Sequence, residues 1–391
     1  MPWKEVSPMD EKVLFLADYL REKQSFTNLC NAYGISRKTG YKLVNRYLEE
    51  GVEGIYNRST APKNHPQQTP FAVRKEIIEL RNRKKIKHGP KKIQTLLLNK
   101  YSEEEVPSTT TIYKILCKEG LIQARKRRRR TPVMPQPFDT VRNPNDVWTA
   151  DFKGQFLTRD SKWCYPLTVM DHETRFLLQC VGHNCINTKA VKREFERLFR
   201  TYGLPDRIRT DNGVPFASRS LGGISHLSKW WIRLGILPER IEPGKPQQNG
   251  AHERMHRTLK SAVIQPPGRN LKHQQKLFNA FRQEYNEERP HETLKQKTPA
   301  SMYQKSSREF PSKLPEIEYP GHYRIISVSS NGHLYCFSGI VYAGHVLKGE
   351  RVGIEEVQDG VWKVYFGPVY LGSFDQRDIM KHKYGYCSLK V

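Results

Sequence analysis

The spacing of apolar residues changes once along this chain, near Asp146, and that change limits the folds that the chain can adopt. Before this point apolar residues recur every three or four positions, which is the period of helices with one buried face. After it, apolar and polar residues alternate in short runs, which is typical of strands. The 391 residues have room for two to four domains, so we expect helical domains followed by a strand-containing one.

Residues 1–56 are predicted to form three helices. Ser25 is suited to begin the second helix, Gly34 to end it in a left-handed conformation, and Ser36 to begin the third. The short turn between two helices is typical of a helix-turn-helix DNA-binding domain, although an ordinary helical bundle with a solvated charged face is the alternative. The residues expected on the buried face of the first helix are Val13, Leu16, Ala17 and Leu20. The DNA contacts predicted on the third helix are Arg37, Lys38, Thr39, Tyr41 and Lys42.

The same pattern recurs in residues 71–122, after a proline-containing linker over residues 57–70. Phe71–Arg83 is predicted as a helix, Gly89-Pro90 begins a second and Pro107-Ser108 begins a third. Two basic three-helix units in tandem favour DNA binding over a plain bundle. The contacts predicted in the second unit are Lys91, Lys92, Thr109, Thr110 and Tyr113.

The chain is strongly basic, with 66 Lys and Arg residues, 40 Asp and Glu residues and a formal net charge of +26. This charge favours nucleic acid as a partner, because each phosphate neutralised by Lys or Arg releases condensed counterions. Residues 125–130 are all basic and repel one another, so residues 123–145 are predicted to be an extended linker until they meet phosphate. A nuclear-localisation signal is the alternative for this run, and nothing else in the sequence supports it. The predicted contacts in the run are Arg125, Arg127, Arg128, Arg129 and Arg130.

Residues 146–310 combine strands with helices. Trp148–Leu157, Tyr165–Met170 and Arg175–Val181 are predicted as strands, then Ala190–Tyr202 as a helix and Arg207–Arg209 as a further strand. This order is that of an RNase H-like α/β core with a mixed five-stranded sheet. The elements predicted to complete it are a helix at Leu227–Leu234, a strand at Arg240–Glu242 and helices at Asn249–Val263 and Leu271–Asn286.

Residues 311–391 are predicted to form a small all-β domain. Five short strands are expected between Tyr323 and Phe374, which suits an SH3-like barrel. Asn331-Gly332 and Asp359-Gly360 each separate two apolar runs, and such dipeptides favour tight hairpins.

The seven cysteines are odd in number, scattered and never spaced C-x-x-C, which argues against a disulfide framework or a zinc module. The N-terminus lacks the apolar run of a signal peptide, and no stretch approaches the roughly 20 apolar residues of a membrane span. We therefore expect a cytoplasmic protein with reduced thiols and no membrane partner.

Three carboxylates lie at positions where they could take part in catalysis. Asp151 lies inside an apolar strand, Asp211 follows a strand in a turn, and Glu253 lies in the first turns of a helix. Taken singly, each has an ordinary explanation as a solvent-facing, turn or helix-start residue. Together they could hold two Mg²⁺ ions about 3.5–4 Å apart, which is a recurrent arrangement for cutting phosphodiester bonds.

The sequences WTADF, RTDNG and PQQNGAHERMHRTLK together resemble the three catalytic blocks of DDE transposases and retroviral integrases. The block YNEERPHETL and the following TPA resemble bacterial IS481-like insertion-sequence transposases. The separation of 41 residues between Asp211 and Glu253 is slightly longer than is usual in that family. An N-terminal His/His/Cys/Cys zinc module, present in retroviral integrases, is missing from the sequence, which favours an insertion-sequence transposase.

The resemblance implies catalytic and metal-binding roles for Asp151, Asp211 and Glu253, with two Mg²⁺ ions that Mn²⁺ can replace. It implies binding to the terminal inverted repeats, hydrolysis of the 3′ ends by metal-activated water, and transfer of the 3′-OH into target DNA. The implied partners are double-stranded element ends and target DNA, with a dimer or tetramer at the bacterial nucleoid. The residues expected to position DNA near the metals are Asn212, Lys245, Gln248, Asn249, Arg254, Arg257 and Lys260.

Two other classes of protein remain as alternatives. A DNA-binding protein without catalytic activity, such as a domesticated transposase, would use the helical units and the C-terminal barrel. A zinc peptidase would use His252, Glu253 and His256, which match the H-E-x-x-H pattern.

Overall fold

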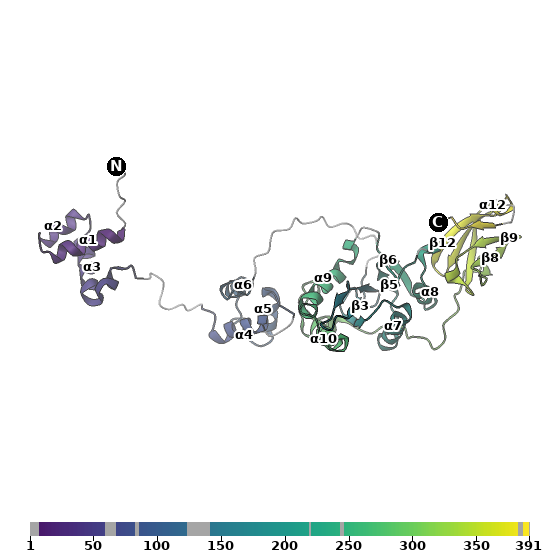
Figure 1. Ribbon diagram of the computed structural model, residues 1–391, viewed down its shortest axis with the longest axis horizontal. Coiled ribbons are helices and arrows are strands. Elements are labelled where there is room, and N and C mark those ends of the chain that lie inside the picture. The colour runs from purple at the N-terminus through teal and green to yellow at the C-terminus, as the bar shows by residue number, and fades with distance from the viewer. Residues whose placement is uncertain are drawn as a thin grey trace. The chain divides into compact units, whose positions relative to one another are not determined.

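The computed structural model describes residues 8–58, 68–82, 86–122, 141–218, 220–242, 246–381 and 386–390 (Figure 1). The chain divides into two compact units, residues 1–68 and residues 69–391. Each unit is described by itself below.

The first unit contains α1 (Pro8–Leu20), α2 (Phe26–Ala32) and α3 (Arg37–Glu50). Both predicted serine caps are present, because Ser25 Oγ accepts a hydrogen bond from the Asn28 N–H and Ser36 Oγ accepts one from the Thr39 N–H. Gly34 has a φ of 62°, as expected for the left-handed end of a helix. The predicted helix-turn-helix geometry of this segment is therefore formed.

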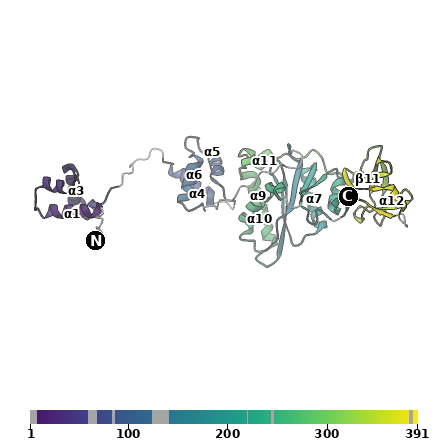
Figure 2. The same ribbon diagram turned by 90° about the horizontal axis from the view of Figure 1, so that it is seen from above.

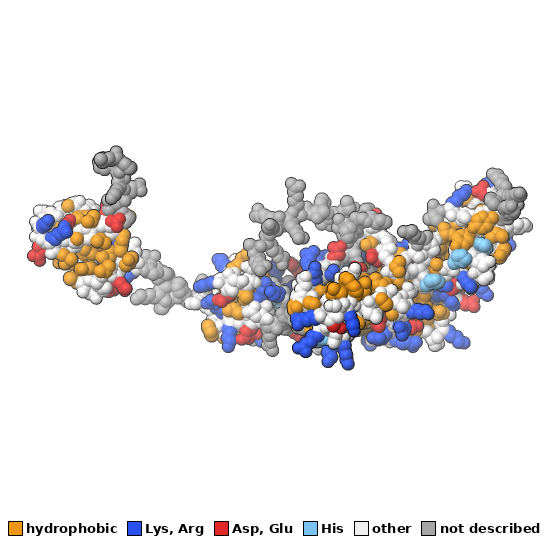
Figure 3. Space-filling view, in the orientation of Figure 1, with side chains coloured by type: hydrophobic (Ala, Val, Ile, Leu, Met, Phe, Trp, Pro, Cys, Tyr) orange, Lys and Arg blue, Asp and Glu red, His pale blue; other side chains and the backbone are white. Residues whose placement is uncertain are grey.

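The buried face of α1 differs from the predicted one. Phe15 and Leu16 are 1% and 3% exposed, whereas Val13 and Leu20 are 47% and 55% exposed. Phe15 makes edge contacts with the rings of Phe26 and Tyr33, and these aromatic contacts rotate α1 about its axis relative to the expected face. The large exposed apolar residues contribute to the orange areas of this unit in Figure 3.

Helix α3 packs very closely against α2 at Gly40. A Cβ atom at Gly40 would lie 2.7 Å from Cys30 Sγ and 2.9 Å from the Phe26 ring. Glycine inside a helix costs about 1 kcal/mol relative to alanine, and here the close approach of two helices requires it.

The second compact unit, residues 69–391, begins with three helices that form the second helical unit. They are α4 (Phe71–Asn82), α5 (Pro90–Leu98) and α6 (Thr109–Lys118). Ser108 caps α6 by accepting a hydrogen bond from the Thr111 N–H. The helices share a small apolar core, made of Val73, Ile77, Ile93, Leu97, Val106, Ile112 and Leu116. Ile86, between α4 and α5, is 1% exposed and belongs instead to the core of the sheet domain, beside Tyr285 and Phe281.

The sheet domain is built on a mixed sheet in the strand order β2-β3-β1-β5-β6. Strand β4 lies off this path and pairs with residues 165–170 of β3. Strand β1 is central, antiparallel to β3 and parallel to β5. The predicted strand over Trp148–Leu157 is interrupted, and the last predicted strand lies slightly earlier in the chain than expected. The strands are β1 (Val147–Phe152), β2 (Phe156–Leu157), β3 (Trp163–Asp171), β4 (Leu177–His183), β5 (Arg207–Thr210) and β6 (Leu237–Arg240).

Helices cover both faces of this sheet, as Figure 2 shows for α9 and α10 on one side and α7 on the other. On the face covered by α7, Trp148 packs with Phe195 and Trp231. On the face covered by α9 and α10, Met170 packs with Met255 and Phe278. The helices are α7 (Thr188–Tyr202), α8 (His226–Arg233), α9 (Gly250–Leu259), α10 (Leu271–Gln283) and the short α11 (Pro299–Met302). Single π-helical turns extend α9 over Lys260–Ile264 and α10 over Glu284–Glu288.

The C-terminal strands form two small open sheets around one apolar core, and the predicted closed barrel is not confirmed. One sheet has the order β12-β11-β10-β7 and the other β13-β9-β8. The Asp359-Gly360 hairpin is confirmed between β10 and β11, but Asn331-Gly332 connects strands of different sheets. The elements are β7 (Arg324–Ser327), β8 (His333–Cys336), β9 (Gly339–Tyr342), β10 (Arg351–Gln358), β11 (Val361–Phe366), β12 (Val369–Asp375), α12 (Gln376–Lys381) and β13 (Tyr386–Ser388).

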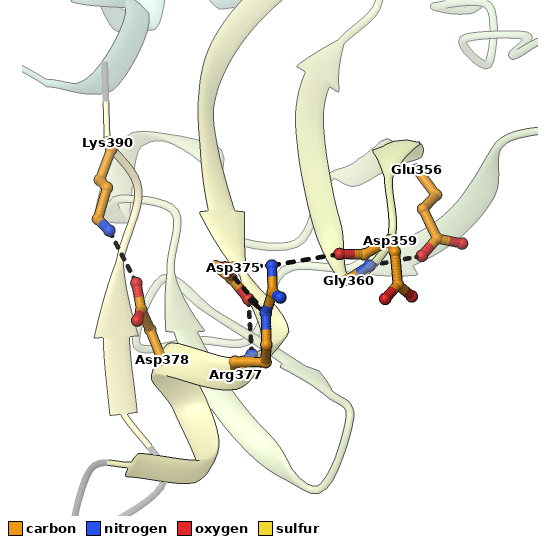
Figure 4. A network of polar contacts seen from close by, with 7 residues as sticks. All are labelled: Glu356, Asp359, Gly360, Asp375, Arg377, Asp378 and Lys390. Atoms are coloured by element: carbon orange, nitrogen blue, oxygen red, sulfur yellow. Dashed lines mark hydrogen bonds and ion pairs between the residues drawn. The ribbon is translucent and has the colours of Figure 1, made fainter.

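Polar contacts tie the β10–β11 hairpin to the start of α12 (Figure 4). Arg377 donates to both carboxylate oxygens of Asp375 and, at 3.4 Å, to the carbonyl oxygen of Asp359. Lys390 Nζ lies 2.7 Å from Asp378 Oδ2 and so links α12 to the end of the chain (Figure 4). These contacts link α12 to the β10–β11 hairpin, to the end of β12 and to the end of the chain.

All seven cysteines are free. Among the described residues, we find no helix with the length and apolar character needed to cross a membrane.

Candidate active site

Asp151 and Asp211 are brought to one edge of the sheet by the pairing of β1 with β5. The two strands are parallel, with Ala150 opposite Thr210, so the next residue on each strand is one of the two aspartates. Both carboxylates are partly buried, and Asp211 Oδ1 accepts a hydrogen bond from the Gly213 N–H at 3.1 Å. The sequence pattern placed each aspartate at a strand, and the register places them side by side.

Helix α9 is fixed to the same sheet by two buried histidines. His252 shares hydrogen bonds of 2.8 Å with Thr149 Oγ1, through Nδ1, and of 2.7 Å with Thr168 Oγ1, through Nε2. His256 Nε2 lies 2.7 Å from the same Thr168 Oγ1. Because Glu253 follows His252, its exposed side chain leaves the helix beside this anchored face.

The charges of the three carboxylates act on one another. Burial, together with the negative charges of Asp211 and Glu253, raises the pKa of Asp151 to about 7, against the lowering effects of the Phe152 N–H and of Lys153. A carboxylate whose charge is disfavoured by burial and by two like charges is a group that a cation would stabilise. The three residues therefore form one electrostatic cluster.

The hydrogen bonds at Thr168 determine how His256 faces Asp151. Thr168 Oγ1 donates to the carbonyl oxygen of Asp151 at 3.0 Å, so in that arrangement it accepts from Nε2 of both imidazoles. Nδ1 of His256 is then an acceptor, 3.7 Å from Asp151 Oδ2. Burial lowers the pKa of His252 to about 3 and that of His256 to about 2, which keeps both rings neutral.

Asp151, His252 and His256 also place one possible ligand atom each within 4.8 Å of one another. Both ring nitrogens of His252 are already hydrogen-bonded to threonines, so this histidine is engaged in holding α9. His252 and His256 both bond to Thr168 Oγ1, whereas Glu253, which would be the general base of a zinc peptidase, is exposed. The donor set of Asp151, Asp211 and Glu253 consists of oxygens alone, which suits Mg²⁺.

Two of the amides predicted to position DNA make contacts within the protein. Asn212 Nδ2 donates to the carbonyl oxygen of Ile241 at 2.8 Å. Gln248 accepts from the Glu242 N–H and donates to the Glu242 carboxylate. Asn249 is 4% exposed, and its Oδ1 has no hydrogen-bond partner among the described residues. These contacts hold the loops around Asp211 and Glu253, and DNA contact by these amides stays a prediction.

The basic residues of α9 and its extension, Arg254, Arg257 and Lys260, are all exposed. Arg254 Nε donates to the Gly250 carbonyl oxygen, which directs its side chain toward the start of α9. Lys245 lies outside the described residues. The residues of the basic run that also lie outside them are Arg125, Arg127, Arg128, Arg129 and Arg130.

The predicted DNA contacts in the helical units differ in exposure. All five on α3 are exposed, and Tyr41 stacks on Phe26 with ring centroids 4.1 Å apart. In the second helical unit (α4–α6) Thr110 and Tyr113 are exposed, whereas Lys92 and Thr109 are partly buried. Lys91 is exposed and forms an ion pair with Glu292 of the sheet domain.

Sequence reasoning missed the threonines that support the site. Thr149 and Asp151 are two positions apart on β1 and therefore point to the same face of the sheet, which is the signal that could have revealed Thr149. Thr168 lies opposite Asp151 on β3, and only the strand register shows this.

Comparison with known proteins agrees with this architecture. Two models described as "Integrase core domain" match residues 141–246 and 234–299. A model described as "Helix-turn-helix domain" matches residues 11–63, and one described as "Homeodomain-like domain" matches residues 39–116. Residues 141–299 thus match integrase cores and residues 11–116 match DNA-binding helical domains.

Two insertion-element proteins are similar in sequence. The uncharacterized 31.7 kDa protein of insertion element IS407 from Burkholderia multivorans is 30% identical over 211 residues, 53% of this chain and 73% of that protein. The uncharacterized 39.2 kDa protein of insertion element IS476 from Xanthomonas euvesicatoria is 28% identical over 247 residues, 61% of this chain and 67% of that protein.

Solved structures with lower similarity include a simian T-cell lymphotropic virus intasome in complex with PP2A regulatory subunit B56 gamma. The match is 15% identical, covers 72% of this chain and 97% of that one, and has a TM-score of 0.36. The HTLV-2 integrase catalytic core domain in complex with magnesium, in its trimeric form, is 16% identical, with 41% and 98% coverage and a TM-score of 0.33. The integrase-core matches and the insertion-element relatives together show that the chain belongs to the insertion-sequence transposases with an integrase-type core.

Proposed function

We propose that this transposase binds the terminal inverted repeats of its element, hydrolyses the 3′ ends and transfers the 3′-OH groups into target DNA by direct transesterification. The observation that carries the proposal is the electrostatic cluster of Asp151, Asp211 and Glu253. They come from two neighbouring parallel strands and one helix, and the charges of the other two raise the pKa of Asp151. Converging carboxylates beside an anchored basic helix suit phosphodiester chemistry on DNA.

The cluster is suited to hold two Mg²⁺ ions, or Mn²⁺ in their place, with Asp151 shared and Asp211 and Glu253 holding one each. When bound, these ions would lower the pKa of a water molecule and stabilise negative charge on the phosphate. The fit rests on the hard oxygen donors and on the raised pKa of Asp151, which a nearby cation would bring back down.

The protein's own residues have positioning tasks in this proposal. His252 holds α9 on Thr149 and Thr168, so Glu253 keeps its place relative to Asp151. Pre-organisation of this kind matters because a misplacement of about 1 Å can cost roughly 10²-fold in rate. Arg254, Arg257 and Lys260 then face solvent on the same helix, where they are placed to contact the DNA backbone.

In the proposal, recognition of the element ends belongs to the helical units. Helix α3 exposes Arg37, Lys38 and Lys42, as expected of a helix that enters the major groove. Two ends must be joined during transposition, so we expect a dimer or tetramer on DNA, at the nucleoid of a bacterial cell. Size-exclusion chromatography with light scattering, with and without end DNA, measures this state.

Three substitutions test the assignment of the site, Asp151→Asn, Asp211→Asn and Glu253→Gln. Each should lower metal-dependent cleavage and strand transfer by about 10³-fold or more while leaving DNA binding intact, because each removes a metal ligand but no DNA-reading side chain. The assay uses a labelled duplex of the DNA that flanks the coding gene, with Mg²⁺, Mn²⁺ or EDTA.

Asp206→Asn is the matched control, because Asp206 lies just before β5 and its 62% exposed side chain forms an ion pair with Arg308. It should leave cleavage unchanged. Full activity in any one of the three site variants would remove that residue from the site. Specific binding with no metal-dependent cleavage by the wild type would instead favour a DNA-binding protein without catalytic activity.

A further inference from the structure

A pocket of about 180 Å³ lies between α5 of the second helical unit and α9 of the sheet domain. Its floor comes from Tyr285 in the π-helical turn after α10 and from Met255 of α9. Its charged lining comes from four different segments of the chain. The charged and titratable residues of the lining are Lys92, Arg175, Arg254, Arg289, His291 and Glu292.

The lining carries an excess of positive charge. Lys92, Arg175, Arg254 and Arg289 are cationic side chains, and Glu292 is the one carboxylate among the described lining residues. The carboxylate of Glu292 is paired with Lys91, which stands outside the pocket lining. The four cations are therefore not neutralised from within the pocket.

Two of these cations have buried N–H groups without a partner. Nη1 of Arg175 and Nη1 of Arg289 are buried and have no hydrogen-bond acceptor among the described residues. An unsatisfied buried donor costs about 1–3 kcal/mol, and more when the group is charged. A native protein retains such groups where a ligand or ion satisfies them.

Three carboxylates outside the lining, Asp171, Glu173 and Glu284, act on Arg175 and Arg289. Asp171 acts on Arg175, but its oxygens already accept from Asn145, from the Thr174 N–H and from the Thr174 hydroxyl. Glu173 also acts on Arg175, and Glu284 acts on Arg289. Burial and the charge of Arg289 lower the pKa of Lys92 to about 7, against the raising effect of Glu292.

Arg175, which lines the pocket, has a strained backbone. Arg175 has a φ of 62° in the turn between β3 and β4, a left-handed conformation that costs a non-glycine residue roughly 1–2 kcal/mol. Such strain is retained mostly where the surroundings or a function require it. Here it accompanies a guanidinium that lines the pocket.

We propose that this pocket binds one backbone phosphate of duplex DNA, held by Arg175 and Arg289 and flanked by Lys92 and Arg254. Guanidinium groups match the oxygens of phosphate in a bidentate geometry, and a small pocket admits a phosphate but no base pair. The bound phosphate would join the second helical unit to the helix that carries Glu253. The proposal rests on the proposed function only in taking DNA as the source of the phosphate.

The salt dependence of DNA binding tests the pocket without any catalysis. The experiment measures the affinity of the full chain for a random-sequence 30-base-pair duplex in EDTA, by fluorescence anisotropy over a series of salt concentrations. Each lost phosphate contact lowers the slope of log K against log [salt] by roughly 0.9. Arg175→Gln, Arg289→Gln and the double variant should each reduce the magnitude of this negative slope by the value of about one phosphate contact. The double variant should equal the single ones because both arginines hold the same phosphate.

Arg197→Gln is the control, since it removes the same charge from an exposed side chain on α7 that pairs with Glu194. It should leave the slope unchanged. Slopes equal to wild type in both arginine variants, or an equal fall in Arg197→Gln, would overturn the pocket. If a variant with a buried substitution is unfolded by circular dichroism, Lys92→Gln at the edge of the pocket gives the same reading.

A second measurement separates DNA phosphate from free phosphate. Inorganic phosphate should raise the melting temperature of the wild type above that in chloride at equal ionic strength, and Arg289→Gln should lose this rise. A rise with phosphate but no change in the DNA slope would assign the pocket to a free anion and overturn the DNA proposal. Because Asp151→Asn is read by cleavage and the pocket by EDTA binding, the two proposals fail independently.

Discussion

The two helical units have the same local design and different surroundings. In each, a serine caps the third helix, with Ser36 accepting from Thr39 and Ser108 accepting from Thr111. The first unit has a core of its own within residues 1–68. The second gives Ile86 to the core of the sheet domain and Lys92 to the pocket beside α9. The same sequence pattern therefore specifies the fold of a unit, while its neighbours decide whether it is an independent reader of DNA or a fixed part of the enzyme.

Deletion of residues 1–68 should have the largest effect on this comparison. If the first unit is an independent reader, its loss should reduce the preference for end DNA over random DNA by about 10³-fold or more, which is the usual range of specific over non-specific binding. The melting temperature of residues 69–391 should not change. Mobility-shift assays on both DNAs and differential scanning calorimetry measure the two quantities, and an equal loss of core stability would contradict the division.

Ile86→Ala compared with Ile55→Ala should separate the two cores. Both side chains are buried, at 1% and 4% exposed, and each truncation should cost about 2–4 kcal/mol in free energy of unfolding. Ile86→Ala should lower the stability of the sheet domain, followed by the fluorescence of Trp148 and Trp231. Ile55→Ala should leave that transition unchanged and should increase hydrogen exchange only in residues 8–58.

Acid should lower the stability of the sheet domain around His291, which lines the pocket between α5 and α9. It should leave the first helical unit unchanged, because residues 8–58 contain no histidine. Burial lowers the pKa of His291 to about 3, while the unfolded chain has a histidine pKa of about 6.5. Its contribution to stability is therefore complete above pH 6.5 and is lost as the pH falls toward 3, because only the unfolded state then takes up the proton.

His291→Gln isolates this contribution, since Asp151, whose raised pKa acts in the opposite direction, is common to both proteins. Between about pH 6.5 and pH 5 the wild type should lose roughly 1–2 kcal/mol more than the variant. Urea denaturation at several pH values measures the difference, and parallel curves would show that His291 is accessible to protons in the folded state.

Lys91→Gln should have the smallest effect. The ion pair between Lys91 and Glu292 joins the second helical unit (α4–α6) to the sheet domain, but the two side chains are 64% and 67% exposed. Water and salt screen such a pair, so its loss should leave the urea midpoint within experimental error. A clear fall would mean that surface charge, rather than Ile86, holds the second unit in place.

Much of this architecture could be predicted from local patterns. Serine caps, Gly34 and the alternation around β1 are signals within a few residues. They gave the helix starts and the turn correctly, whereas the strand predicted over Trp148–Leu157 is divided into β1 and β2. The three carboxylates were assigned from the order of the motifs along the chain, and their catalytic role stays a prediction. The register of β1 and β5 then explains why two aspartates separated by 59 residues meet.

The failures come from contacts that are distant in sequence. The expected hairpin at Asn331-Gly332 was wrong because β7 pairs with the distant β10. Strand β8 pairs instead with β9 through a turn at Phe337-Ser338, where two non-glycine residues have φ values of 52° and 56°. Strand β13 pairs parallel with β9, which no local signal reveals. His252 carried a motif for zinc, and only the threonines on two strands show that it is a structural anchor.

The position of Ile86 has a consequence for synthesis of the chain. Ile86 and Tyr285 belong to the same apolar cluster although 198 residues separate them. At about 5–20 residues per second, a ribosome needs roughly 10–40 s to make the second partner after the first. The second helical unit can close its own core at once, but Ile86 stays exposed during that interval. A nascent chain arrested before residue 285 should therefore bind a holdase chaperone near residue 86.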